Sequence, residues 1–149
     1  MARIGYKKGA LEALGGFVPL PFIVLDSRAY QTLSTAAKTL LIDVARQHTG
    51  GNNGGLSPCW ELMSRRGWKS KATLQNAKNE VRLSGLITVT RIGTRKKGDC
   101  ELWALSWFKL DYRPDMDIQP KAHNYMGFME IKDAKIDPIP RRRIDVLRD

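Results

Sequence analysis

The chain has 149 residues, 42% of them hydrophobic and 27% charged, which fits one ordinary domain with its own core and excludes a disordered tail. Its longest apolar run, residues 17–25, contains two prolines, so no segment is expected to cross a membrane, and Glu12 interrupts the only candidate for a signal-peptide core. The net charge of +10 suggests an anionic partner. Because neither a membrane-crossing segment nor a signal peptide is expected, we predict a cytoplasmic protein without a membrane partner.

The first 33 residues are predicted to form an arm, an extended segment and a short helix. Four glycines interrupt residues 1–16, which indicates a flexible N-terminal arm. Prolines restrict the residues before them to extended geometry, so FVPLPFIVLDS at 17–27 is predicted to be extended. Asp26 or Ser27 can then cap a short helix that runs through Leu33.

A longer helix is predicted over residues 35–48. Ser34 precedes it as an N-cap, and Gly50 follows its end. Its apolar residues recur at helical spacing, which predicts one buried face. That face consists of Ala37, Leu40, Leu41, Val44 and Ala45.

The glycine-rich stretch GGNNGG at 50–55 is predicted to be a flexible connecting loop. A phosphate-binding P-loop would continue with Lys and then Ser or Thr, whereas this chain continues with Leu56 and Ser57. Leu56 is predicted to pair as a very short strand, and Ser57 to cap a second helix with Pro58 in its first turn. This helix is predicted to end at Gly67 and to direct Trp60 or Cys59, Leu62 and Met63 toward the core.

A third helix is predicted over residues 71–84, after a turn of only three or four residues. Ser70 has the character of an N-cap, and Gly85 ends the helix. Most of its surface carries hydrogen-bonding and cationic side chains. Its narrow apolar face consists of Leu74, Ala77 and Val81.

A β-hairpin is predicted next. LITVTRIG at 86–93 and CELWALSWF at 100–108 alternate as strands do, and a polar turn connects them. Trp103 and Trp107 can stack on single-stranded bases, but at this strand spacing we favour packing against the long helix or a partner subunit.

Residues suited to catalysis or metal binding are few. Cys59 and Cys100 are far apart without a CxxC motif, which favours two buried thiols over a disulfide or a zinc site. The chain has two histidines and no recognisable pairing of a nucleophile with a base. We therefore predict that the protein is not an enzyme and that it uses no metal and no cofactor.

Positive charge is concentrated in about a quarter of the chain. Between Leu62 and Lys97 there are ten basic residues and one acid, Glu80, whereas residues 109–149 hold nine basic and eight acidic residues. A charge that served only solubility would be spread more evenly, so this region is predicted to face the anionic partner.

The element order is that of an α+β domain of the winged helix-turn-helix class, with a three-helix core and a β-hairpin wing. In this class the second helix of the helix-turn-helix pair, here residues 71–84, enters the DNA major groove, where Lys, Gln, Asn and Thr reach bases or phosphates. The wing supplies cations to the backbone or the minor groove. An ordinary solvated helix is the alternative.

The predicted DNA contacts are Lys69, Ser70, Lys71, Thr73, Gln75, Asn76, Lys78, Asn79 and Arg82 on the recognition helix, Arg65 and Arg66 before it, and Arg91, Arg95, Lys96 and Lys97 on the wing. Lys78 and Arg82, near the far end of the helix, are expected to touch only phosphate or water.

Several short motifs also occur in an order known from one family. They are Val18 to Pro21, Leu33-Ser34, Asn52-Asn53-Gly54 before Leu56-Ser57, Trp68 with Thr73, Gly85-Leu86-Ile87 and Thr90-Arg91. In this order, residues 17–108 resemble winged-helix proteins encoded by proteobacterial phages, prophages and plasmids. The resemblance implies a DNA-binding regulator, and some such proteins act in replication initiation.

The predicted domains are the arm at 1–16, the winged helix-turn-helix domain at 17–110 and a C-terminal extension at 111–149. The extension contains four prolines together with aromatic and methionine residues, so we expect it to pack on its own domain or on a second subunit.

The sequence therefore predicts a sequence-specific double-stranded DNA-binding protein, a transcriptional regulator of a bacterial mobile element that is associated with the nucleoid. The alternatives are a plasmid or phage replication-initiation or accessory factor and a winged-helix module that binds protein or RNA. A homodimer would match paired DNA half-sites, which mirror a two-fold protein.

Overall fold

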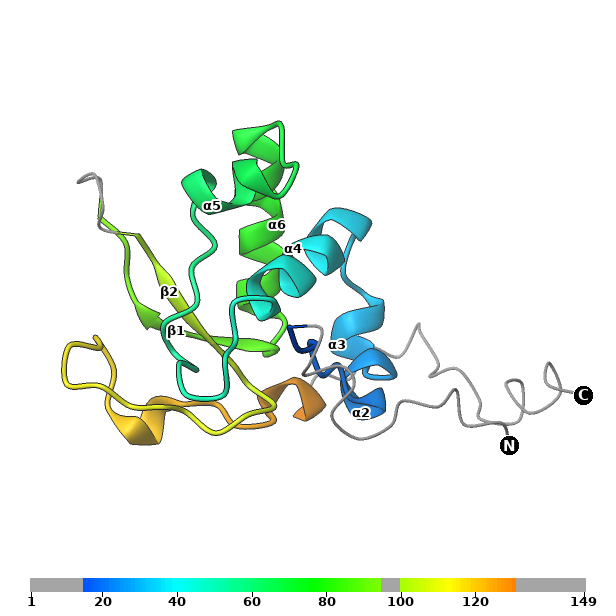
Figure 1. Cartoon of the computed structure of the whole chain (residues 1–149). Coiled ribbons are helices and arrows are strands. Elements are labelled where there is room, and N and C mark those ends of the chain that lie inside the picture. Colours follow the sequence, from blue (N-terminus) through cyan, green and yellow to red (C-terminus); the bar gives the residue numbers. More distant parts are fainter. Residues whose placement is uncertain (1–14, 95–99, 131–149) are drawn as a thin grey trace, which may run out of the picture.

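The computed structural model describes residues 15–94 and 100–130, and in them helices pack beside a two-stranded antiparallel sheet (Figure 1). The fold is therefore α+β, as predicted. None of the helices in these two segments has the length and apolar character that a membrane crossing needs.

The segment after the N-terminal prolines differs from the prediction. Helix α2 spans Phe22–Leu25, where an extended chain was expected. A helix can form after Pro21 because a proline restricts only the residue before it. Pro21 is the N-cap, and its carbonyl accepts hydrogen bonds from the amides of Val24 and Leu25. Helix α3 follows at Arg28–Gln31, and Ser27 caps it by accepting a hydrogen bond from the Tyr30 amide at 3.2 Å.

Helix α4, Thr35–Ala45, is the centre of the core. The Ser34 hydroxyl caps it by accepting a hydrogen bond from the Ala37 amide, which confirms the predicted cap. The five predicted apolar residues are all buried, although the helix ends three residues earlier than expected.

The GGNNGG stretch forms a connecting loop, as predicted, and hydrogen bonds of Asn53 hold it in place. The Asn53 side chain is fully buried; its oxygen accepts from the Leu105 amide, and its nitrogen donates to the carbonyls of Leu105 and Lys109. Leu56 forms a bridge to Trp103, which confirms the predicted short strand. This loop joins the end of α4 to the sheet.

Helix α5, Trp60–Arg65, begins later than predicted. Its N-cap is Cys59, because both backbone groups of Ser57 are bonded to the Gln47 side chain and keep that residue out of the helix. Met63 is buried as predicted, but Leu62 is exposed. A helix of six residues has one inward face, and Met63 occupies it together with Trp60.

Helix α6, Lys71–Leu83, packs on α4 through the predicted face of Leu74, Ala77 and Val81. Its N-cap is Ser70, as predicted. Gly85 follows with a φ of +76°, and a Cβ there would lie 3.0 Å from the backbone nitrogen of Phe128. Glycine is therefore needed here for two reasons. Its positive φ ends α6, and the missing Cβ leaves room for the C-terminal extension to pack against it.

Strands β1, Ile87–Arg91, and β2, Leu102–Leu105, form the predicted hairpin, with Val89 opposite Trp103. Trp103 and Trp107 are buried in the core, which confirms packing rather than a surface for stacking bases. The predicted wing residues Arg95, Lys96 and Lys97 lie outside the described residues.

The described part of the C-terminal extension packs on its own chain. The Asp117 and Met126 amides donate to the carbonyls of Thr90 and Ser106, each at 2.8 Å. The extension also contains two short 3-10 helices, Pro120–Ala122 and Gly127–Glu130, and Phe128 in the second is buried in the core. The described part of the extension therefore packs along the surface of the same domain, and Phe128 joins its core.

Candidate nucleic-acid interface

A single buried carboxylate fixes the turn between α5 and α6. Asp43 of α4 accepts a hydrogen bond from the Trp68 indole at 2.9 Å and pairs with the Arg66 guanidinium at 3.3 Å. Gly67 between these two residues has a φ of +99°, a backbone conformation that suits glycine. The angle between α5 and α6 is therefore held from α4, and Arg66 is tied to the protein while remaining about half exposed.

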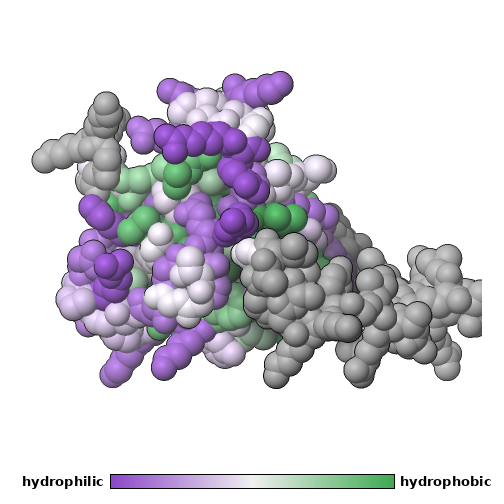
Figure 2. Space-filling model, viewed as in Figure 1, coloured by the Kyte–Doolittle hydropathy of each residue, from purple (hydrophilic) through white to green (hydrophobic). Residues whose placement is uncertain are grey.

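The first half of α6 presents its polar side chains to solvent. Lys69, Ser70, Lys71, Thr73, Gln75 and Asn76 are all exposed. No described residue forms a hydrogen bond or an ion pair with the side chains of Arg65, Lys69 or Asn76, and the Lys71 ammonium lies 5.7 Å from the centre of the Trp60 ring. Figure 2 shows strongly hydrophilic residues over the end of the molecule where α5 meets α6.

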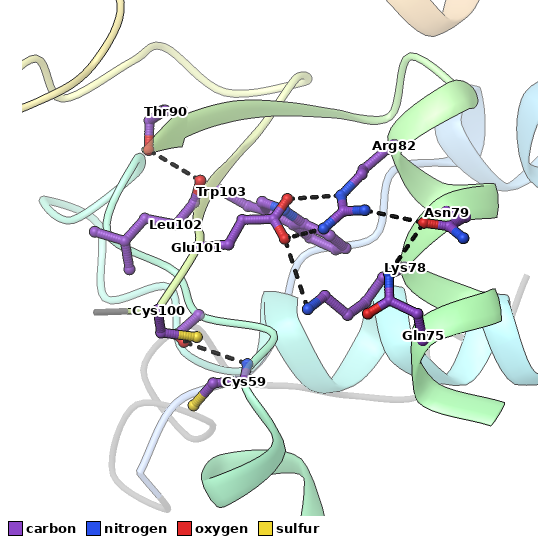
Figure 3. Close-up of polar contacts among 11 residues, drawn as sticks. Cys59, Gln75, Lys78, Asn79, Arg82, Thr90, Cys100, Glu101, Leu102 and Trp103 are labelled. Carbon is purple, nitrogen blue, oxygen red and sulfur yellow. Dashed lines mark hydrogen bonds and ion pairs between the residues drawn. The ribbon is translucent and has the colours of Figure 1, made fainter. Parts of the chain in front are cut away.

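The second half of α6 is bound to the sheet through Glu101 (Figure 3). Arg82 donates to both carboxylate oxygens of Glu101, one bond being 2.7 Å long, and the Lys78 ammonium lies 3.6 Å from the same carboxylate. The Trp103 indole also donates to Glu101, at 2.8 Å. The expectation that Lys78 and Arg82 touch only phosphate or water was therefore wrong.

Electrostatics agree with this pairing. Burial would raise the pKa of Glu101, but the hydrogen bonds from Arg82 and Trp103, with the charges of Arg82 and Lys78, hold that pKa below its ordinary value. The hydrogen bond to Glu101 raises the pKa of Arg82. Both groups are therefore charged at neutral pH, and the pair is a fixed part of the fold.

A hydrogen-bond chain extends from this pair along the surface of α6. The Asn79 side-chain oxygen accepts from Arg82 at 2.9 Å and from Gln75 at 3.2 Å. An asparagine that reads adenine needs both its oxygen and its nitrogen, and the Asn79 oxygen is already engaged. Asn76 keeps both groups available with respect to the described residues.

The one acid of the basic region is also engaged. The Glu80 carboxylate accepts hydrogen bonds from the Ser34 amide at 3.0 Å and from the Ser34 hydroxyl at 2.6 Å. This contact joins α6 to the start of α4. Glu80 is therefore directed away from the exposed cations at the other end of α6.

A groove of about 600 Å³ separates the second half of α6 from the hairpin. Its lining includes Lys78, Arg82, Glu101 and the loop residues Ile92 and Thr94. Arg91, the predicted wing cation within the described chain, lies at the end of β1 opposite Leu102 and is partly exposed.

Sequence reasoning missed Asp43 and Glu101, the two acids that organise this surface. A signal for Glu101 was present, because strand alternation puts it on the same face as Trp103, and an acid on a tryptophan-bearing face indicates burial beside a cation. In residues 15–94 and 100–130, no group of three or more His, Cys, Asp or Glu is placed to hold a metal ion.

Comparisons with family models, curated proteins and solved structures gave no match to this chain. Its function is therefore inferred from its own residues and their arrangement.

Proposed function

We propose that this chain is a winged helix-turn-helix protein that binds double-stranded DNA in a sequence-specific manner and regulates transcription in a bacterial mobile element. In this proposal α6 is the recognition helix and the β1–β2 hairpin is the wing. The observation that carries it is the first half of α6, whose exposed polar face points outward while its apolar face is anchored on α4.

The chemistry of that face suits DNA. Residues 65–76 contain four basic residues and no acid, so the potential there attracts phosphate. Gln75 and Asn76 supply amide groups of the kind that pair with adenine, and Thr73 can meet a thymine methyl group. The turn held by Asp43 sets the angle of α6 before DNA arrives, so little ordering is needed on binding.

In this proposal, the side chains that contact DNA bases all lie in the first half of α6. Lys78 and Arg82 already neutralise Glu101, so DNA would have to compete with an internal carboxylate for them. We assign them to the support of the recognition helix, and Arg65, Lys69 and Lys71 to phosphate contacts.

A fluorescence anisotropy titration of labelled duplex pools, random and genomic, at two salt concentrations tests the proposal. With these three phosphate contacts, affinity should fall about 40-fold between about 50 and 200 mM salt. The double substitution Lys69→Gln with Lys71→Gln should weaken binding about tenfold and lower the salt slope by about 2. Lys78→Gln is the matched control, with the same chemical change on the same helix, and should lower the slope much less.

Sequence preference is tested by selecting duplexes with Gln75→Ala and Asn76→Ala variants. Each should relax the preferred site at one or two positions, at a cost of about 1–3 kcal/mol per lost bidentate contact. Unchanged selected sites would reject α6 as the reading helix, and salt-independent binding would reject DNA as the partner.

The same titration separates the alternatives. A replication factor would use the same surface and select repeats at an origin rather than promoter-proximal sites. A-form RNA has a major groove too deep and narrow for a helix, so double-stranded RNA that competes as well as DNA would favour the RNA-binding alternative.

A further inference from the structure

Two cysteines that are distant in the sequence lie side by side in the fold. Cys59 immediately precedes α5, and Cys100 leads into β2 (Figure 3). The Ser57 hydroxyl joins them, because it accepts a hydrogen bond from the Cys59 amide at 3.3 Å and donates to the Cys100 sulfur at 3.2 Å. Both residues are partly exposed, which corrects the prediction of two buried thiols.

The two sulfur atoms have different acidities. Burial would raise the pKa of Cys59, but hydrogen bonds from Ser57, the Leu62 backbone and the Cys100 thiol lower it. Burial raises the pKa of Cys100, and its neighbour Cys59 raises it further. Cys59 is therefore the better nucleophile of the pair, and the Ser57 hydroxyl, which contacts both residues, holds Cys100 near it.

Both cysteines also lie at the surface, where their partial exposure lets a small oxidant approach. Cys100 lines the open groove between α6 and the hairpin, and Cys59 lies at the start of a surface helix whose next residues, Trp60 and Glu61, are partly or fully exposed. A buried structural thiol would lack such access.

We propose that Cys59 and Cys100 are a redox-active dithiol that closes to an intramolecular disulfide when a peroxide oxidises the protein. The Cys59 thiolate attacks one peroxide oxygen, the O–O bond breaks, and a sulfenic acid forms with release of one water after protonation. The Cys100 thiol loses its proton and attacks that sulfur, the S–O bond breaks, and a second water leaves. The two thiols lose two electrons in total, and the peroxide gains them.

The disulfide would connect the start of α5 to the start of β2. Everything between the two cysteines, including α6 and β1, would then lie in one closed loop. Such a bond is of the transient, redox-sensing kind found in intracellular proteins, and a thiol reductant would reopen it.

The test uses the purified, reduced full-length chain and hydrogen peroxide. After brief treatment and quenching with N-ethylmaleimide, intact mass measurement should show a monomer that has lost two hydrogens and carries no maleimide. Dithiothreitol should restore two maleimide sites. The same exposure in urea is the control for proximity, and disulfide formation there should be at least tenfold slower.

Two variants separate the roles of the cysteines. Cys100→Ser should leave Cys59 as a sulfenic acid that dimedone traps, whereas Cys59→Ser should leave Cys100 largely unoxidised and reactive with maleimide. Ser57→Ala should slow the wild-type reaction severalfold. Two maleimide-reactive thiols after peroxide, a disulfide between two chains, or equal rates in the folded and unfolded chain would each overturn the proposal. None of these readouts depends on DNA binding.

Discussion

The two halves of α6 have similar side chains and different surroundings. Residues 71–76 and 77–83 both contain lysine or arginine and side-chain amides. In the first half these groups are exposed to solvent, although Lys71 lies over the Trp60 ring and Gln75 donates a hydrogen bond to Asn79. In the second half Lys78 and Arg82 converge on the buried carboxylate of Glu101.

This difference shows that the charge count of a helix does not measure the charge it can offer to a partner. A lysine paired with an internal carboxylate contributes little to the outward field, whereas an unpaired one contributes fully. The second half of α6 supports the fold, and the first half keeps its polar side chains exposed to solvent. Three substitutions in and around α6 test this division.

The largest effect is expected from Arg82→Ala. It leaves Glu101 buried without its main partner, and we expect the free energy of unfolding to fall by about 2–3 kcal/mol at neutral pH. Lys71→Ala in the first half should change it by less than about 0.5 kcal/mol. Urea denaturation of both variants measures this, and equal losses would mean that the two halves are not distinct.

A smaller effect is expected from Glu101→Gln, which should lower the free energy of unfolding by about 1–2 kcal/mol at neutral pH. The folded-state pKa of Glu101 is lowered, so the unfolded chain binds more protons at acid pH. The stabilisation is therefore fully present above the ordinary pKa of 4.5 and is lost as the pH falls from there toward the lowered value.

The difference in the free energy of unfolding between the wild type and Glu101→Gln should therefore become smaller at acid pH. Denaturation at about pH 7 and at steps down to about pH 3 measures it. A gap that stayed constant over this range would show that Glu101 is not the titrating group, and that the anchor of the second half works by shape alone.

The smallest effect is expected from Ser70→Ala, which should lower the free energy of unfolding by about 1 kcal/mol. The Thr73 amide loses the hydroxyl that caps it at the start of α6. Hydrogen exchange should accelerate at residues 71–74 and not at 77–83, which Glu101 and the core hold. Ser64→Ala is the matched control, since among residues 15–94 and 100–130 its hydroxyl bonds only the Glu61 carbonyl, on the exposed surface of α5. Faster exchange along the whole helix would show that its two halves are not independently held.

The elements that could be predicted from sequence depend on contacts between near neighbours. Ser34 and Ser70 cap helices through amides three residues away, and the apolar periodicity of α4 and α6 matches their buried faces. The start of α5 was mispredicted because Gln47 holds Ser57 outside the helix. Gln47 and Ser57 are ten residues apart, so no local sequence pattern predicts this contact.

The amino-acid sequence by itself determined where the long helices and the hairpin form and where positive charge accumulates, because capping, periodicity and composition are local properties. Only the tertiary structure decided which cations are available, because Glu101 is nineteen residues from Arg82 and meets it only once β2 pairs with β1 beside α6. The same closure brings Cys100 to Cys59. Contacts of this length follow from strand register and helix packing, which a linear pattern does not specify.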